Sequence, residues 1–225
     1  ILENCALAER ESTPLCQDTG TLTFYVDESL RRKVTQKALY KAVAAATELG
    51  YLRRNSIDSV TGRSNDDNCA PGSVVIYYKK TKGVTLVMKG GGSENMSRQY
   101  SLPDQTLGAG RDLQGVRKCL LDAVQRIQGF GCAPGILGVC IGGDRATGFS
   151  IAKEQLLRPL DEKPTRFEKK ILSEANSLGI GPMGLGGKTT LLGVKIASVA
   201  RLPASFFVTV AYMCWACRRQ TIMIK

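Results

Sequence analysis

Three cysteines stand among residue types that hold a thiolate on an exposed turn. Cys16 follows Pro-Leu and precedes Gln-Asp-Thr-Gly, Cys132 precedes Ala-Pro-Gly, and Cys214 precedes Trp-Ala-Cys-Arg. Glycine and proline shape turns whose backbone N–H groups point outward, which suits a metal cluster or a bound anion better than a hydrophobic core. The cysteines are 116 and 82 residues apart, so spacing alone identifies no cluster. Their local settings nevertheless predict a metal-dependent enzyme.

The remaining cysteines carry weaker signals. Cys5, Cys119 and Cys140 are expected to fill the core as small apolar side chains. Cys214 and Cys217 form a C-x-x-C pair, which a thioredoxin-like redox site would place at a helix N-terminus after a strand. The sequence contains no histidine, so the commonest general base and most zinc chemistry are missing from it. Thiolates are the metal ligands that remain.

The net charge of +11 is typical of a chain that binds nucleic acid or an anionic substrate. The basic pairs are scattered, and aromatic residues make up only 6% of the sequence, so no basic stripe or base-stacking platform is evident. We therefore expect a small anionic substrate and no nucleic acid. The sequence has no apolar run that could span a membrane and does not begin like a signal peptide, which predicts no membrane partner, reduced thiols and a cytoplasmic location.

A glycine-rich segment at residues 179–190 imitates a P-loop, because it ends in Gly187-Lys-Thr. The first glycine of G-x-x-x-x-G-K-T would fall at position 182, where Pro182 lacks the N–H that a phosphate needs. A strand-like run follows instead of a helix. ATP binding is therefore not expected, although a glycine-rich loop that binds another anion is.

The elements that must position these residues alternate between strands and helices. Hydrophobic periodicity predicts helices over residues 29–49 and 111–128 and a helical region over 154–178 that is broken near Pro159 and Pro164. Strands are predicted over residues 21–26, 73–78, 83–88, 136–141, 191–199 and 205–213.

Two connections between these elements are informative. The strands over 73–78 and 83–88 are expected to form a hairpin through the lysine-rich turn at 79–82. The polar, aperiodic segment 51–68 is long for an idle connection and is expected to be functional. The whole chain, 1–225, is predicted to be one α/β domain with helices around a mixed sheet, and its first residues look like the end of a helix from a longer protein.

Five segments together resemble the iron–sulfur hydro-lyase family of class I fumarases and L(+)-tartrate dehydratases. They occur in the family's order and extend over nearly the whole chain. The segments are PLCQDTG at 14–20, KGGGSEN at 89–95, GCAPGILG at 131–138, GPMGLGGKT at 181–189 and RLPAS at 201–205. The resemblance implies the alpha, or N-terminal, part of such an enzyme, with its fold.

The resemblance also implies a cofactor. Three cysteines of the family hold a 4Fe-4S cluster whose fourth iron is open to substrate, and they correspond to Cys16, Cys132 and Cys214. An open iron acts as a Lewis acid on the leaving hydroxyl. Cys217 is the alternative third ligand, but the family places its cysteine four residues before an arginine, here Arg218.

Substrate residues follow from the same resemblance. The matching positions are Gln17, Asp18, Arg53 or its neighbour Arg54, Gly91 and Gly92, with Gln17 and Asp18 also catalytic. A guanidinium and backbone N–H groups suit a dicarboxylate, and an aspartate near the cluster can relay a proton. Leu202 occupies the place of a histidine found in many members, so a proton transfer assigned to that histidine is not available here.

The predicted function is the reversible hydration of a C4 dicarboxylate by the alpha subunit of an iron–sulfur hydro-lyase. Fumarate to L-malate, a step of the tricarboxylic acid cycle, is the first choice. The alternatives are an L(+)-tartrate dehydratase alpha subunit and a non-enzymatic thiol or anion-binding module that has lost its cluster. The expected partner is the beta, or C-terminal, part of the enzyme, in a homodimer or a hetero-oligomer.

Overall fold

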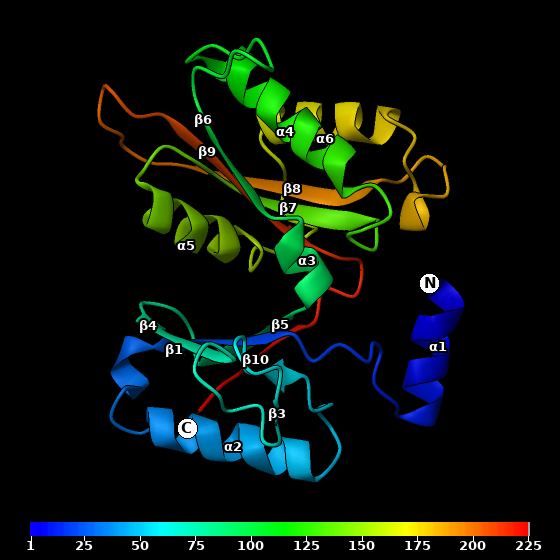
Figure 1. Ribbon diagram of the computed structural model, residues 1–225, viewed down its shortest axis with the longest axis vertical. Helices are drawn as coiled ribbons and strands as arrows, with labels where there is room; N and C mark the ends of the chain where they lie inside the picture. The colour runs from blue at the N-terminus through cyan, green and yellow to red at the C-terminus, as the bar shows by residue number, and fades with distance from the viewer. Residues whose placement is uncertain (225) are drawn as a thin grey trace. The chain divides into compact units, whose positions relative to one another are not determined.

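The computed structural model describes residues 1–224 and confirms the predicted α/β class (Figure 1). Its two compact units are Ile1–Gly91 together with the segment from Arg218 onward, and Gly92–Cys217. Each unit has its own four-stranded mixed sheet. In residues 1–224, no helix has both the length and the apolar character that crossing a bilayer requires.

The first unit is built on a sheet with the strand order β10-β5-β1-β4. Its main helix, α2, packs Leu39 and Val43 against Leu22 and Val26 of the central strand. A short ribbon of β2 and β3 lies within the segment 51–68. The elements are α1 (Leu2–Glu11), β1 (Thr21–Asp27), α2 (Gln36–Glu48), β2 (Ser56–Ile57), β3 (Ser64–Asn65), β4 (Val74–Lys79), β5 (Val84–Lys89) and β10 (Arg219–Ile222).

The predicted hairpin of β4 and β5 is wrong, because β1 lies between the two strands. β1 runs parallel to β4 and antiparallel to β5, and Phe24 pairs with Ile76 on one side and Leu86 on the other. Residues 22–26 are all buried, and such a continuously buried strand is stable at the centre of a sheet rather than at its edge. The turn between β4 and β5 passes over the end of β1, where the Thr81 N–H donates to Asp27.

The second unit has the strand order β6-β9-β7-β8. Helices α4 and α6 cover one face of this sheet and α5 covers the other (Figure 1). Gly138 permits the close approach of α5, since a Cβ there would lie 2.1 Å from the Ala152 carbonyl oxygen. The elements are α3 (Gly91–Asn95), β6 (Arg98–Ser101), α4 (Leu113–Ile127), β7 (Gly135–Ile141), α5 (Arg145–Gln155), α6 (Arg166–Ser177), β8 (Leu191–Ser198) and β9 (Phe207–Met213).

A buried carboxylate ties α6 to the sheet of the second unit. Glu168 is fully buried, accepts the N–H of Ile196 at 2.7 Å and that of Thr165 at 2.7 Å, and pairs with Arg158 at 3.0 Å. Burial alone would raise the pKa of Glu168, but the two N–H donors and Arg158 hold it below its usual range. The ionised form therefore stabilises the fold.

Most predicted elements are present within a few residues of their expected limits. The helix expected over 29–49 is shorter, because Thr35 caps α2 by accepting the Ala38 N–H at 3.3 Å and the preceding residues form a 3-10 turn and bends. Cys119 and Cys140 are buried as expected, and burial raises the pKa of Cys119 to about 12 and that of Cys140 to about 11. Cys5 was expected in the core but is exposed, since α1 buries none of its side chains.

Candidate functional site

The loop that carries Cys16 leads from α1 into β1. Cys16 is half-buried, and its Sγ lies 3.5 Å from the Asp18 backbone N–H, which points toward it. Gly20 has a φ of 69°, and a Cβ there would lie 2.3 Å from the Lys89 carbonyl oxygen. Glycine is needed here because the loop packs directly on the end of β5.

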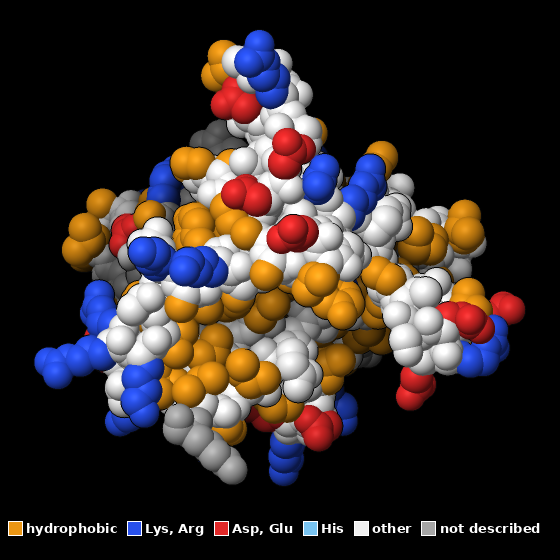
Figure 2. Space-filling view, turned by 90° about the horizontal axis from the view of Figure 1, so that it is seen from below, with side chains coloured by type: hydrophobic (Ala, Val, Ile, Leu, Met, Phe, Trp, Pro, Cys, Tyr) orange, Lys and Arg blue, Asp and Glu red, His pale blue; other side chains and the backbone are white. Residues whose placement is uncertain are grey.

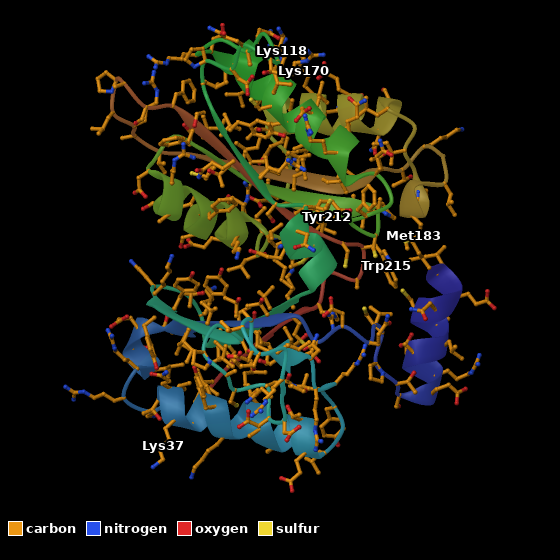
Figure 3. All side chains as sticks on the ribbon, viewed as in Figure 1. Lys37, Lys118, Lys170, Met183, Tyr212 and Trp215 are labelled. Carbon is orange, nitrogen blue, oxygen red and sulfur yellow. The ribbon has the colours of Figure 1, made fainter. Side chains whose placement is uncertain are left out.

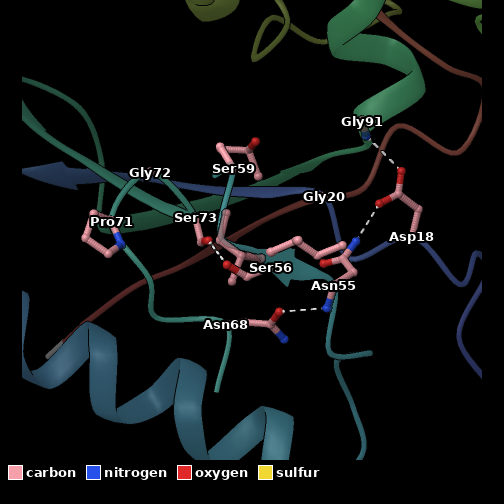
Figure 4. Close-up of a pocket in the computed structure, with 13 residues that line it drawn as sticks. Asp18, Gly20, Asn55, Ser56, Ser59, Asn68, Pro71, Gly72, Ser73 and Gly91 are labelled. Atoms are coloured by element: carbon pink, nitrogen blue, oxygen red, sulfur yellow. Dashed lines mark hydrogen bonds between the residues drawn. The ribbon is translucent and has the colours of Figure 1, made fainter. Parts of the chain in front are cut away.

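Both oxygens of the Asp18 carboxylate are held in place (Figure 4). Oδ1 accepts from Asn55 Nδ2 at 2.8 Å, and Oδ2 accepts from the Gly91 N–H at 2.8 Å. A Cβ at Gly90 would lie 2.6 Å from Oδ2, so the glycine leaves room for the carboxylate. Asp18, Asn55 and Gly91 line a polar pocket of about 360 Å³. The Gly91 N–H, which the sequence predicts to bind substrate, thus donates its hydrogen bond to Asp18 in this structure.

A larger pocket of about 980 Å³ lies in the same unit. Cys16, Gln17, Arg53 and Arg218 line it, together with uncharged residues. No aspartate or glutamate is among the described residues that line this pocket. Two arginines without a lining carboxylate make it a suitable place for an anion.

The structure separates Arg53 from its neighbour. Both side chains are exposed, but Arg53 lines the larger pocket, whereas Arg54 does not and lies 3.8 Å from Asp66 at the surface. On the face shown in Figure 2, Lys and Arg side chains are scattered among acidic ones rather than gathered in a stripe. Arg53 therefore fits the predicted role better than Arg54 does.

In the second unit, the loops of Cys132 and Cys214 are joined. The Trp215 N–H lies 3.4 Å from the Cys132 carbonyl oxygen, and the Cys214 N–H donates to Ser93 Oγ at 3.1 Å. Cys132 has a φ of 52°, a conformation that is uncommon for a residue with a side chain. Both thiols are half-buried. Two of the three predicted ligands are thereby brought to one end of one sheet.

Tyr212 lies between these two loops, and Figure 3 shows it at the same end of β9 as Trp215. A Cβ at Gly131 or Gly135 would lie 2.5 Å or 2.2 Å from atoms of its ring. Burial raises the pKa of Tyr212, and the nearby thiols of Cys214 and Cys132 raise it further. Its hydroxyl is fully buried and has no hydrogen-bond partner in the described part of the chain.

These features fit a thiolate-bound cluster. Half-buried thiols on loops are suitable ligands, and an unpaired buried hydroxyl beside two of them is polar lining that a bound group would complete. Within residues 1–224, no three Cys, Asp or Glu side chains gather as a metal site. Cys16 belongs to the first unit and the other two cysteines to the second, so the three-cysteine site stays a prediction.

The thioredoxin-like alternative for Cys214 and Cys217 is wrong. The Cys217 N–H donates to the Cys214 carbonyl oxygen at 3.2 Å, and this turn leads into the strand β10. A thioredoxin-like pair needs a helix at that point, because the helix N-terminus is what lowers the thiol pKa.

The glycine-rich segment 179–190 supports the Cys132 loop. The Met183 N–H donates to the Ala133 carbonyl oxygen at 2.8 Å, and a Cβ at Gly184 would lie 2.5 Å from the Gly129 nitrogen. The segment continues into β8 rather than a helix, as expected for a chain without a P-loop. Gly92 begins the second unit at the start of α3, and Leu202 is exposed on the loop before β9.

Sequence reasoning missed Asn55 and Asn68, which are hydrogen-bonded to the predicted site residues. The available signal was the long aperiodic segment 51–68, which contains Asn55 and ends at Asn68.

Comparison with known protein families and proteins identifies the family of this chain. The model of the family described as "Fumarate hydratase (Fumerase)" matches residues 1–223. The chain belongs to this iron–sulfur hydro-lyase family. It is 47% identical over its full length to a Geobacillus stearothermophilus protein named "Putative fumarate hydratase class I", and it spans 46% of that protein.

Two further relatives are named as alpha subunits. One is the "Putative L(+)-tartrate dehydratase subunit alpha" of Methanocaldococcus jannaschii, 32% identical, of which the chain spans 83%. The other is the "L(+)-tartrate dehydratase subunit alpha" of Escherichia coli K12, 29% identical, of which it spans 77%. Both matches cover the whole of this chain.

Proposed function

We propose that this chain is the alpha, or N-terminal, part of an iron–sulfur hydro-lyase that interconverts fumarate and L-malate. The observation that carries the proposal is the pocket lined by Cys16, Gln17, Arg53 and Arg218 without a lining carboxylate. Such a pocket attracts a small anion, and a dicarboxylate is an anion of this kind that two arginines can bind. Fumarate is favoured over tartrate because the relative named for fumarate is 47% identical and those named for tartrate are 32% and 29% identical.

Cys16, Cys132 and Cys214 would hold a 4Fe-4S cluster, which supplies a Lewis acid when bound. Arg53 binds a substrate carboxylate, and Gln17 donates a further hydrogen bond in the same pocket. Asp18 relays a proton of the reaction through its carboxylate, which the N–H groups of Asn55 and Gly91 keep at a fixed orientation.

The remaining parts of the enzyme are proposed to come from a beta, or C-terminal, part. The two tartrate dehydratase relatives are named as alpha subunits, and the first relative is about twice as long as this chain. The sequence contains no histidine, so any acid or base role that the enzyme gives to a histidine is proposed to be filled by that part.

Anaerobic reconstitution with iron and sulfide tests the proposal. The chain, mixed with the C-terminal part, is expected to gain the visible absorbance of a cluster and to convert L-malate to fumarate faster than it dehydrates L(+)-tartrate. Cys132→Ser should lose both signals. Faster turnover of tartrate would favour the tartrate dehydratase alternative, and a wild-type chain that takes up no cluster would favour the cluster-less module.

A further inference from the structure

We infer that Asn68 is a positioning residue. It holds the backbone of Arg53 directly, and through Asn55 it fixes the orientation of the Asp18 carboxylate. The inference rests on the proposed function of this site. Asn68 lies in the loop after β3 and is 15 residues from Arg53 and 50 from Asp18 in the sequence. None of the motifs that resemble the family contains it.

A single amide makes three hydrogen bonds here. Asn68 Oδ1 accepts the Asn55 N–H at 3.1 Å, while Nδ2 donates to the Arg53 carbonyl oxygen at 3.0 Å and to Thr47 Oγ1 at 3.1 Å. The residue is 2% exposed. Its φ of 58° is uncommon for a side-chain residue, although asparagine tolerates it better than most. The backbone conformation of Asn68 and its three hydrogen bonds together fix the orientation of the amide.

The segment from Arg53 to Asn55 is fixed at both ends by this amide. At the first end, the Arg53 carbonyl oxygen also accepts from Thr19 Oγ1 at 2.6 Å, which connects it to the Cys16 loop. At the other end, the Asn55 side chain donates to Asp18 Oδ1 at 2.8 Å. The arginine of the larger pocket and the carboxylate of the smaller pocket therefore share one support.

That support is anchored in the helix α2. Thr47 is buried in its last turn and donates from Oγ1 to the Val43 carbonyl oxygen at 2.8 Å. A helix is a more rigid base than the loop that carries Arg53, and a site is most precise when its loop is tied to such an element. Asn68 makes that connection.

Asn68→Asp is the sharpest variant, because it keeps the size and the Oδ1 acceptor but replaces the donor that faces Arg53. Its matched control is Asn65→Asp in the same segment, since Asn65 Oδ1 accepts the Cys69 N–H at 3.0 Å and an aspartate keeps that acceptor. Asn55→Ala removes the bond to Asp18 and leaves the Asn55 N–H in place. The three variants separate the support of Arg53 by Asn68 from the support of Asp18 by Asn55.

With the reconstituted enzyme and L-malate, Asn68→Asp is expected to raise KM at least about tenfold and to lower kcat, because both supported groups move. Asn55→Ala should lower kcat by about tenfold with KM within about twofold, because only Asp18 loses a partner. Asn65→Asp should match the wild type. Equal KM values in the wild type and Asn68→Asp, with both chains folded, would overturn the inference.

Hydrogen exchange on the chain without substrate gives a readout that does not depend on activity. Peptides covering residues 18–20 and 53–56 should exchange their amide hydrogens faster in Asn68→Asp than in the wild type. In Asn65→Asp the same peptides should exchange at the wild-type rate. If the wild type proves inactive on every dicarboxylate, the proposed function fails, while this exchange pattern still decides whether Asn68 holds the segment. If Asn68→Asp does not fold, Asn55→Ala decides, and unchanged kcat together with unchanged exchange at 18–20 would overturn the inference.

Discussion

Replacing Arg53 by alanine is expected to weaken substrate binding and to leave cluster uptake intact. Arg53 lines the pocket with Cys16 and Gln17, and the Thr19 hydroxyl and the Asn68 amide donate to its backbone carbonyl oxygen rather than contacting its guanidinium. The side chain can therefore be removed without breaking the hydrogen bonds that hold its loop.

The magnitude follows from the strength of a charge-assisted hydrogen bond. Such a bond is worth about 1.5–3 kcal/mol, which corresponds to a loss in kcat/KM on the order of ten- to hundredfold. Arg53→Lys should fall between the wild type and Arg53→Ala, because lysine keeps the charge but not the planar pair of donors.

Arg54→Ala is the matched control. The partner of Arg54, Asp66, has a side chain that is 83% exposed and lies 3.8 Å away. An exposed ion pair of this kind contributes about 0–1 kcal/mol to the free energy of folding. Steady-state kinetics with L-malate and cluster absorbance of each variant check the prediction. Wild-type kinetics in Arg53→Ala together with a loss in Arg54→Ala would mean that the two arginines exchange roles, and no effect in either would place the carboxylate-binding group elsewhere.

Three further predictions concern packing and charge. Gly135→Ala places a Cβ about 2.2 Å from the Tyr212 ring and should cost about 1–3 kcal/mol, seen as a lower Tm that the double variant with Tyr212→Ala partly restores. Gly90→Ala should displace the Asp18 carboxylate, whose Oδ2 would lie 2.6 Å from the new Cβ, and lower kcat without changing cluster absorbance. The stability that the Glu168 carboxylate contributes is present above its unfolded-state pKa of about 4.5 and is lost as the pH falls through its lowered folded-state pKa. Urea unfolding should therefore show a lower free energy of unfolding at acidic pH, and Glu168→Gln should reduce this dependence on pH. An unchanged acid response in that variant would refute the reasoning.

Local patterns in the sequence determined most of the elements. The periodicity over residues 111–128 predicted α4, whose buried side chains include Val116, Leu120 and Val124. The apolar run after Gly135 predicted β7, which is buried along its whole length. These predictions succeed because a helix or strand is specified by the spacing of apolar residues within one or two turns or pleats. The family motifs, which are also short and local, pointed to Cys16 and Asp18, and the resemblance placed Arg53 in the loop that follows α2.

Only the tertiary structure decided which distant segments meet. The sequence predicted a hairpin of β4 and β5, but the buried β1 takes the central place between them. Asn55 lies 37 residues from the carboxylate that it contacts, and Tyr212 lies far along the chain from the two glycines that accommodate its ring. Such contacts depend on strand order, register and the close packing of side chains across the whole unit, which no short window of sequence contains.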